Sequence, residues 1–520
     1  MGLLGFRSFR LPERGRPFGA GQSFPGPRAA CSLPPAAVSI GASALLLPVG
    51  SPALNRSVTY RSNCFSFRMK HVHQALRLLL GILWLAPAGV LAQPTSPVLP
   101  ADTALSLQQC LNVALVNQPL VRQARIDQEI TRSTNQIALA GWLPQVGLQG
   151  TAQHYFQLPF TIFPDPTTGT LTPRQIGVRN VTTVGLSGTQ AIYNNDVLLA
   201  ARSKRFNNQA AEQSTVNVKI STVSDVSKSF YDVLLAQRQL DVFSQDIARL
   251  QRNYRDARAR YDTGIADKTE YLQAEVSLNN SLAGRKQAQE AIKARLAYLK
   301  QLMGLPPERR LAVQYDTLQL ELEASADTAA ALNTGNRIEL QQLQTQKSLQ
   351  SLTVDYYRFG FLPSLSAFAN YNSVFQNNSA SELYRTRFPN SYAGLQLGLP
   401  IFTGFRRTQN IRRARLQTNR LDEDITNTRN QINTEYATAL ANYKGYYTQY
   451  VLGKRNLEAS KEVYNVINLQ YREGIRAYID LIVAQTTLRT SQLNYYTALF
   501  QLLSSKVDLL RARGELPTEY

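Results

Sequence analysis

The sequence predicts a mainly helical fold with a β-barrel part, in which long coiled-coil helical hairpins occur twice and a pair of strands precedes each one. Three observations support this prediction. The second half of the chain repeats the first, since Tyr261-Asp-Thr-Gly-Ile returns 210 residues later as Tyr471-Arg-Glu-Gly-Ile. Two spans without proline, 174–305 and 401–516, far exceed the length of an average helix. Before each span, apolar and polar residues alternate with a period of two, which is typical of strands.

Composition narrows the classes of function. The chain has 520 residues and a formal net charge of +20, but eight arginines and one acid lie in residues 1–68, and most other basic residues are mixed with Asp and Glu. Because this is the pattern of solvated helix faces, we expect no nucleic acid partner. Only three cysteines and three histidines occur. A catalytic triad, a zinc site or another cofactor is therefore not expected, and the chain is not predicted to be an enzyme.

The N-terminal region carries a targeting segment. Residues 69–92 begin with Met69-Lys70, continue as an apolar run and close with Val90-Leu-Ala, which together describe a secretory signal peptide. We expect the mature protein to begin at Gln93. Residues 1–68 precede this signal and are interpreted as a start-site artefact. An organellar transit peptide is the alternative, because the segment is rich in arginine and poor in acids.

The first structural repeat is expected over residues 93–304 and begins with a helix. A strand pair follows, with one strand in 144–158 and its partner in 181–193, joined by a polar, turn-rich loop. In the first strand Val146 and Leu148 share one face, while glutamines and threonines occupy the other. Long helices then fill the proline-free span.

The second structural repeat is expected over residues 336–514, after an inter-repeat linker at 305–335 and before a C-terminal tail at 515–520. The linker has a mixed composition and is expected to add small elements beside the helices. The two strands of this repeat show the same alternation as before. Their apolar positions include Leu365, Ala367, Leu395 and Leu397.

Each proline-free span keeps an apolar or aromatic residue at every seventh position, which is typical of coiled coils. One glycine interrupts each span, Gly264 in the first and Gly474 in the second. Because glycine adopts positive φ at little cost, each span is predicted to be a helical hairpin or a long helix with a sharp break. The seventh positions are Val226, Val233, Leu240, Ile247, Tyr254 and Tyr261 in the first copy, and Tyr436, Tyr443, Tyr450, Leu457, Tyr464 and Tyr471 in the second.

Alternating strands of this kind fit a transmembrane barrel, apolar outward and polar inward, and they also fit a sheet in a water-soluble protein. The signal peptide and the long coiled coils favour the membrane. Four strands are too few to close a barrel, which needs about eight, and an open edge in lipid leaves backbone groups unsatisfied. The chain is therefore predicted to oligomerise, and the pattern permits a dimer, a trimer or a larger ring.

These features together resemble the TolC-like outer-membrane efflux proteins. The resemblance covers residues 104–514 and rests on the signal peptide, the duplicated helix, strand pair and helical hairpin, and Tyr-x-x-Gly-x-x-x-x-x-(Asp/Glu) at each break. It implies a homotrimer in outer-membrane lipid, whose protomers each give four transmembrane β-strands to one barrel and whose helices form an α-barrel through the periplasm. It also implies a passive export channel of a tripartite efflux or type I secretion system, served by an inner-membrane transporter and a periplasmic adaptor protein. Whether small molecules or polypeptides are exported stays open.

The resemblance also implies a periplasmic gate where the hairpins turn. Aligned on the two glycines, Tyr471 and Arg476 match a clamp on the second hairpin, and Thr269 and Glu270 match its partners on the first. Asp480 matches an acidic residue that lines the pore constriction. The hairpin tips, where the adaptor docks, are Gly264, Ile265, Gly474 and Ile475.

The chain departs from the family pattern at Val483, where well-known members carry a second acidic ring, so block by multivalent cations is not implied. A different class of function is the alternative. A periplasmic or extracellular coiled-coil tether would explain the heptads, but it would explain neither the signal peptide nor the strand pairs.

Overall fold

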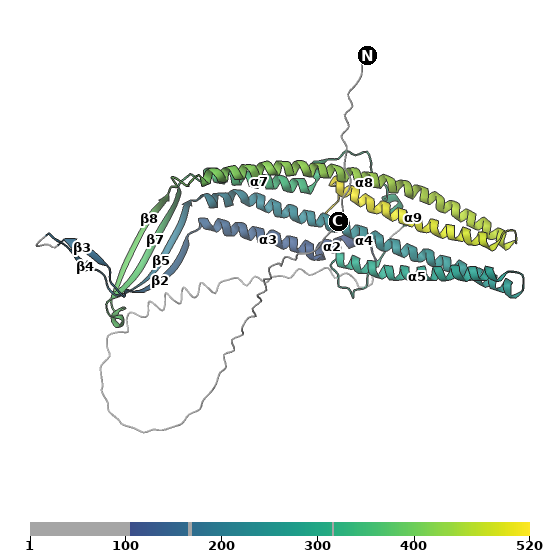
Figure 1. Cartoon of the computed structure of the whole chain (residues 1–520), viewed down its shortest axis with the longest axis horizontal. Coiled ribbons are helices and arrows are strands. Elements are labelled where there is room, and N and C mark those ends of the chain that lie inside the picture. Colours follow the sequence, from purple (N-terminus) through teal and green to yellow (C-terminus); the bar gives the residue numbers. More distant parts are fainter. Residues whose placement is uncertain (1–103, 165–168, 315–316, 520) are drawn as a thin grey trace, which may run out of the picture. The chain divides into compact units, whose positions relative to one another are not determined.

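The computed structural model describes residues 104–164, 169–314 and 317–519. The predicted N-terminal extension (1–68) and signal peptide (69–92) lie outside these ranges. Within them most residues are helical, and four long helices form two hairpins (Figure 1). The prediction of a mainly helical fold is confirmed.

The two hairpins are close copies of each other. The first consists of α4 (Asn195–Asp262, 68 residues) and α5 (Lys268–Leu302, 35 residues). The second consists of α8 (Arg406–Arg472, 67 residues) and α9 (Tyr478–Arg513, 36 residues). The helices of each pair lie side by side (Figure 1). Of the two forms predicted for each span, the hairpin is the one that the chain adopts.

Both hairpins turn on a glycine in the left-handed conformation, with φ of +74° at Gly264 and +75° at Gly474. In the first turn the amide of Ile265 donates to the carbonyl of Arg260 (2.9 Å), and the amide of Gly264 donates to that of Tyr261 (2.9 Å). The second turn repeats the same pair of bonds at equivalent positions. These bonds form a Schellman motif, which requires positive φ and therefore favours glycine.

Shorter helices precede each strand pair. α2 (Leu107–Asn117) and α3 (Pro119–Leu139) pack on α4, and α7 (Ile338–Phe359) packs on α4 and α8. A capping box starts α2, because Ser106 and Gln109 each accept the other's backbone amide through their side chains. No helix in the described part of the chain has a stretch long and apolar enough to cross a membrane. The single-turn helices are η1 (Ala140–Trp142), η2 (Thr334–Asn336) and η3 (Ala380–Glu382).

The apolar core includes heptad positions of both copies. Val226 is fully buried and Tyr443 is 3% exposed. Two tyrosines of the second copy have a role that the heptad pattern did not indicate, because their hydroxyls reach the linker. Tyr443 donates to the carbonyl of Ala324 (3.0 Å), and Tyr436 donates to that of Ala330 (3.1 Å). The seam of the second copy thereby holds the inter-repeat linker in place.

The linker carries small elements, as predicted. β6 (Ala312–Val313) pairs in parallel with β1 (Ala104–Leu105), and α6 (Thr317–Glu323) packs on α9. Leu320 of α6 is buried in the same core as the heptad residues. The linker therefore belongs to the packed part of the chain.

Four strands form one antiparallel sheet in the order β2-β5-β7-β8 (Figure 1). They are β2 (Gln145–His154), β5 (Asn180–Tyr193), β7 (Ser364–Asn377) and β8 (Arg387–Gly398). The central pair, β5 and β7, joins the two copies of the repeat. Within the described residues, β2 and β8 each pair on one side only.

One face of this sheet carries apolar residues from all four strands, interrupted by polar ones such as Ser373, Ser391 and Arg387. Leu148 lies opposite Leu186, which in turn lies opposite Tyr371, and Ala367 lies opposite Leu395. Residues directly opposite in antiparallel strands point to the same face, so the apolar positions of the four strands lie on one surface. Four of its side chains keep 66–75% of their surface exposed: Val146, Leu148, Leu395 and Leu397.

The loop between β2 and β5 differs from the expectation of a polar, turn-rich connection. It contains a second hairpin, β3 (Phe160–Pro164) paired with β4 (Leu171–Gln175). Phe160 and Ile162 alternate along β3 and are 65% and 63% exposed. One apolar alternation, from Phe160 to Ile162, is too short a periodic signal to outweigh prolines, which usually argue against a strand.

Candidate functional site

The predicted tip residues lie where the two hairpins turn. Ile265 is 78% exposed and Ile475 is 71% exposed. On α9, Ile479 and Val483 follow Ile475 at helical spacing and are 50% and 58% exposed. A row of exposed apolar side chains on one helix face is typical of a surface that contacts a partner.

Behind the turns, a buried aromatic cluster brings the two hairpins together. The rings of Tyr471 and Tyr478 are 5.5 Å apart, and the guanidinium of Arg260 lies 5.0 Å from the ring of Tyr471. Because Arg260 belongs to α4 and Tyr471 to α8, this cation–π contact joins the hairpins. The cluster draws on all four long helices and consists of Ala257, Tyr271, Ala274, Tyr471, Tyr478 and Leu481.

Three buried polar atoms at this cluster have no hydrogen-bond partner among the described residues: the hydroxyls of Tyr471 and Tyr478, and Oε2 of Glu270. Burial raises the pKa of both tyrosines; at Tyr471 the charge of Arg260 opposes this effect and that of Glu270 adds to it. Both phenols are therefore neutral at pH 7. An unsatisfied buried polar group costs free energy, so apolar burial and ring contacts hold the cluster together.

Arg476 and Asp480 lie beside each other on the second hairpin. The guanidinium of Arg476 is 3.6 Å from the Asp480 carboxylate, and its Nε donates to Oε1 of Gln470 at 3.3 Å. Their side chains are 52% and 41% exposed, so solvent screens this ion pair and it contributes little to stability.

The structure therefore places the predicted gate residues in two groups. Tyr471 lies in the buried cluster, and Glu270 of the other hairpin is near enough for its charge to raise the pKa of Tyr471. Arg476 makes its polar contacts within its own hairpin. Thr269 is exposed at the start of α5, where its amide donates to the side chain of Asp267 at 3.4 Å.

Tyr478 of the cluster, and Arg260 which contacts the cluster at Tyr471, were not predicted from the sequence. Tyr478 follows Tyr471 by seven residues and so continues the heptads, but Gly474 lies between them and appeared to interrupt the pattern. Nothing in the sequence separates Arg260 from the other arginines of the same helix.

Comparisons with known proteins agree with this architecture. The family described as "Outer membrane efflux protein" matches residues 110–305 and 331–515. These two ranges hold the two structural repeats, and the gap between them falls in the linker.

Individual relatives are distant. The chain is 25% identical to the alkaline protease secretion protein AprF of Pseudomonas aeruginosa, over 56% of this chain and 59% of that protein's length. It is 21% identical to the toluene efflux pump outer membrane protein TtgC of Pseudomonas putida, over 79% of this chain and 83% of that protein. The match thus spans less than two thirds of the first relative and most of the second.

Solved structures share the fold. The CmeC outer membrane channel of Campylobacter jejuni superposes with a TM-score of 0.64 at 19% identity, over 80% of this chain and 87% of that one. The outer membrane protein VceC of Vibrio cholerae does so with a TM-score of 0.62 at 16% identity, over 78% and 96%.

Proposed function

Because the chain belongs to the outer membrane efflux protein family, we propose that it is an outer-membrane channel of a tripartite efflux or type I secretion system. In this role it is a passive conduit, and an inner-membrane transporter supplies the energy. The observation that carries the proposal is the union of two long helical hairpins with one sheet whose edge strands pair on one side only within the described residues. One relative is named for protease secretion and another for toluene efflux, so polypeptides and small molecules are both candidate substrates.

The sheet edges support assembly into a trimer. In lipid an unpaired strand edge leaves backbone groups unsatisfied, at several kcal/mol each. Three chains of four strands would close a barrel of twelve, an even number above the minimum of about eight. The apolar face around Leu148 would then contact outer-membrane lipid. The opposite face, where Asn372 donates to Asn390 (3.1 Å), would line the channel.

The hairpins would extend into the periplasm, where their ends meet an adaptor protein. The exposed isoleucines support this assignment, because Ile265 and Ile475 occupy equivalent positions and offer the same apolar contact twice in each chain. A trimer would present six such points.

The aromatic cluster and its neighbours would form the periplasmic gate. We assign the clamp to Tyr471 and Arg476 with Thr269 and Glu270, and the constriction to Asp480. Two observations support this assignment. Tyr471 already joins the hairpins, and the buried Oε2 of Glu270 has no hydrogen-bond partner in the described residues, so a guanidinium such as that of Arg476 would satisfy it.

Reconstitution in planar lipid bilayers tests the proposed function. The purified protein is expected in the outer-membrane fraction of cells and should produce discrete single-channel currents in the bilayer. A coiled-coil tether would give neither result. Protein that stays in the soluble fraction and carries no current would overturn the channel assignment.

A further inference from the structure

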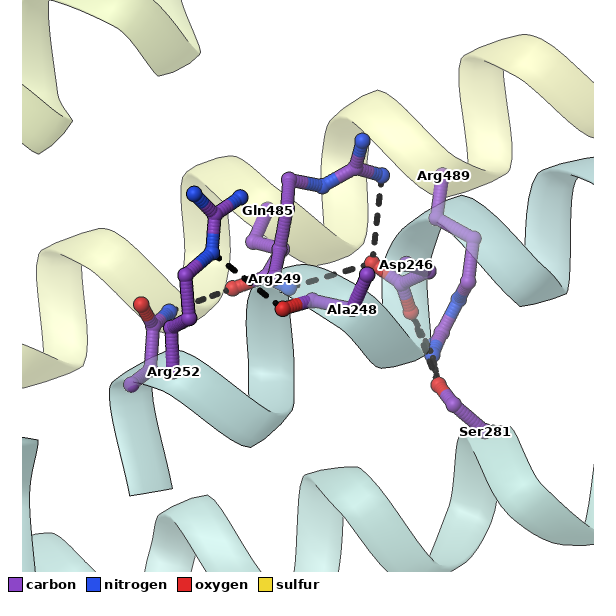
Figure 2. A network of polar contacts seen from close by, with 8 residues as sticks. Asp246, Ala248, Arg249, Arg252, Ser281, Gln485 and Arg489 are labelled. Carbon is purple, nitrogen blue, oxygen red and sulfur yellow. Dashed lines mark hydrogen bonds and ion pairs between the residues drawn. The ribbon is translucent and has the colours of Figure 1, made fainter. Parts of the chain in front are cut away.

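A buried carboxylate links the two hairpins at a level further from the turns than the aromatic cluster. Asp246 of α4 is 1% exposed (Figure 2). It accepts hydrogen bonds from the hydroxyl of Ser281 at 2.8 Å, from the amide nitrogen of Gln485 at 3.1 Å and from the guanidinium of Arg489 at 3.3 Å. Arg249 adds a fourth contact at 3.4 Å. The charge is therefore fully surrounded by donors.

The four donors come in equal numbers from the two hairpins. Ser281 and Arg249 lie on α5 and α4, in the same hairpin as Asp246, whereas Gln485 and Arg489 lie on α9. Two further bonds cross between hairpins: Arg489 donates to Ser281 at 2.8 Å, and Asn253 of α4 donates to Gln485 at 3.0 Å. The guanidinium of Arg249 also lies 5.7 Å from the ring of Tyr464 on α8. All four long helices thus meet at this carboxylate.

The network lies further from the turns than the tip cluster, and Tyr464 contacts both. Asp246 precedes Ala257 of that cluster by 11 residues of α4, which corresponds to about 17 Å along the helix. Buried apolar side chains already pack the hairpins nearby, including Val242, Ile247 and Leu488. Apolar residues in place of the whole network would extend this packing without the desolvation cost of buried charges, so the polar network is not needed for cohesion. It specifies one alignment of the hairpins.

The division of donors makes this contact releasable. If α9 moves away, Asp246 loses Gln485 and Arg489 but keeps Ser281 and Arg249, so its charge stays paired in both arrangements. A contact that is complete in one arrangement and tolerated in the other is what a two-state element requires. We infer that Asp246, Gln485 and Arg489 form a second clasp between the hairpins, which holds the channel entrance closed and is released when it opens. This inference rests on the proposed channel function.

The test is the resting conductance of intact trimers in planar bilayers. Gln485→Leu combined with Arg489→Leu removes both donors of α9 and leaves Asp246 paired within its own hairpin. We expect a several-fold increase in resting conductance. The single variant Gln485→Leu, which is close in size to the original side chain, should give a smaller increase in the same direction, and it decides the question if the double variant does not assemble.

Two controls separate a clasp from a general loss of packing. Leu488→Ala creates a cavity on the same helix, so it should lower the thermal stability of the trimer and leave resting conductance unchanged. Glu290→Gln alters an exposed pair with Lys286 on α5 and should change neither quantity. Intact clasp variants with wild-type conductance, or an equal increase in Leu488→Ala, would overturn the inference. A wild-type protein that forms no channels would instead overturn the proposed function.

Discussion

At the scale of single residues, the contacts between the hairpins are few and of different kinds. The guanidinium of Arg260 lies over the ring of Tyr471. Glu270 has a buried carboxylate oxygen without a hydrogen-bond partner in the described residues. Asp246, in contrast, is fully hydrogen-bonded. The alignment of the two hairpins in this structure therefore depends in part on side chains that can be changed one at a time without removing the apolar core.

The gate assignment predicts the behaviour of one double variant. Arg476→Ser with Tyr471→Ala should raise resting conductance several-fold, because Tyr471→Ala removes the ring that Arg260 of the other hairpin contacts. A gate with a gap of a few kcal/mol shifts its populations several-fold for each kcal/mol removed. Single-channel recording in planar bilayers measures this, with size-exclusion chromatography to verify the trimer. Wild-type conductance in an intact trimer would show that these are ordinary helix-end side chains.

Asp480 should control ion selectivity. In the proposed trimer, three copies of this carboxylate would surround a narrow aqueous constriction and attract cations, so Asp480→Ala is expected to reduce the preference for cations. The reversal potential in a salt gradient measures the change. Glu290→Gln removes an equally exposed acid far from the hairpin ends and serves as the matched control. An identical shift in both variants would argue against a local role for Asp480.

At the scale of elements, the linker is attached to the second hairpin by a charged contact. Glu321 of α6 accepts hydrogen bonds from the ammonium of Lys454 (2.7 Å) and from the hydroxyl of Tyr495. Burial by itself would raise the pKa of Glu321, but these two hydrogen bonds outweigh it and hold the pKa below the ordinary value of 4.5.

This contact predicts a pH dependence of stability. Since the pKa of Glu321 is lower in the folded than in the unfolded protein, its contribution is complete above pH 4.5 and is lost as the pH falls through the folded value. Glu321→Gln should therefore cost about 1–3 kcal/mol at neutral pH and little in acid. Thermal unfolding of both proteins across this pH range tests the prediction, and a constant difference at every pH would contradict it.

The two faces of the strands predict that the loss of stability on substitution depends on which face is altered. Leu148→Arg would place a charge in lipid and should cost about 2–4 kcal/mol near the middle of the membrane. Gln149→Arg, one residue further along β2 and on the opposite face, should be tolerated. Denaturant unfolding in lipid vesicles compares the two variants. Equal losses would show that the apolar face does not contact lipid.

At the scale of the whole molecule, the unpaired edges of the sheet predict how copies of the chain assemble. β2 and β8 each offer an unpaired edge within the described residues, and pairing β8 of one chain with β2 of the next would satisfy both. We expect a detergent-stable homotrimer. Mass measurement of the protein in detergent tests this, and a stable monomer embedded in lipid would refute it.

The sequence by itself determined the duplication, the long helices, their breaks at glycine and the faces of the strands. These features depend on local rules. Proline is rare in helix interiors because it breaks the helix, and glycine readily adopts the positive φ of a Schellman turn. Along a strand, every second side chain points to the same face. Gly264 and Gly474 could therefore be assigned to turns, and Leu148 and Leu395 to one kind of face, without knowledge of any distant contact.

Only the tertiary structure decided which polar residues are buried and what they contact. In the sequence Asp246 looks like one more charge on a solvated helix, and Tyr443 looks like one more heptad position. Their roles depend on Arg489 and Ala324, which lie 243 and 119 residues away along the chain. The same holds for the pairing of β5 with β7, which joins the two copies. Burial and hydrogen bonding are properties of neighbours in space, and local periodicity carries no information about which distant residue becomes a neighbour.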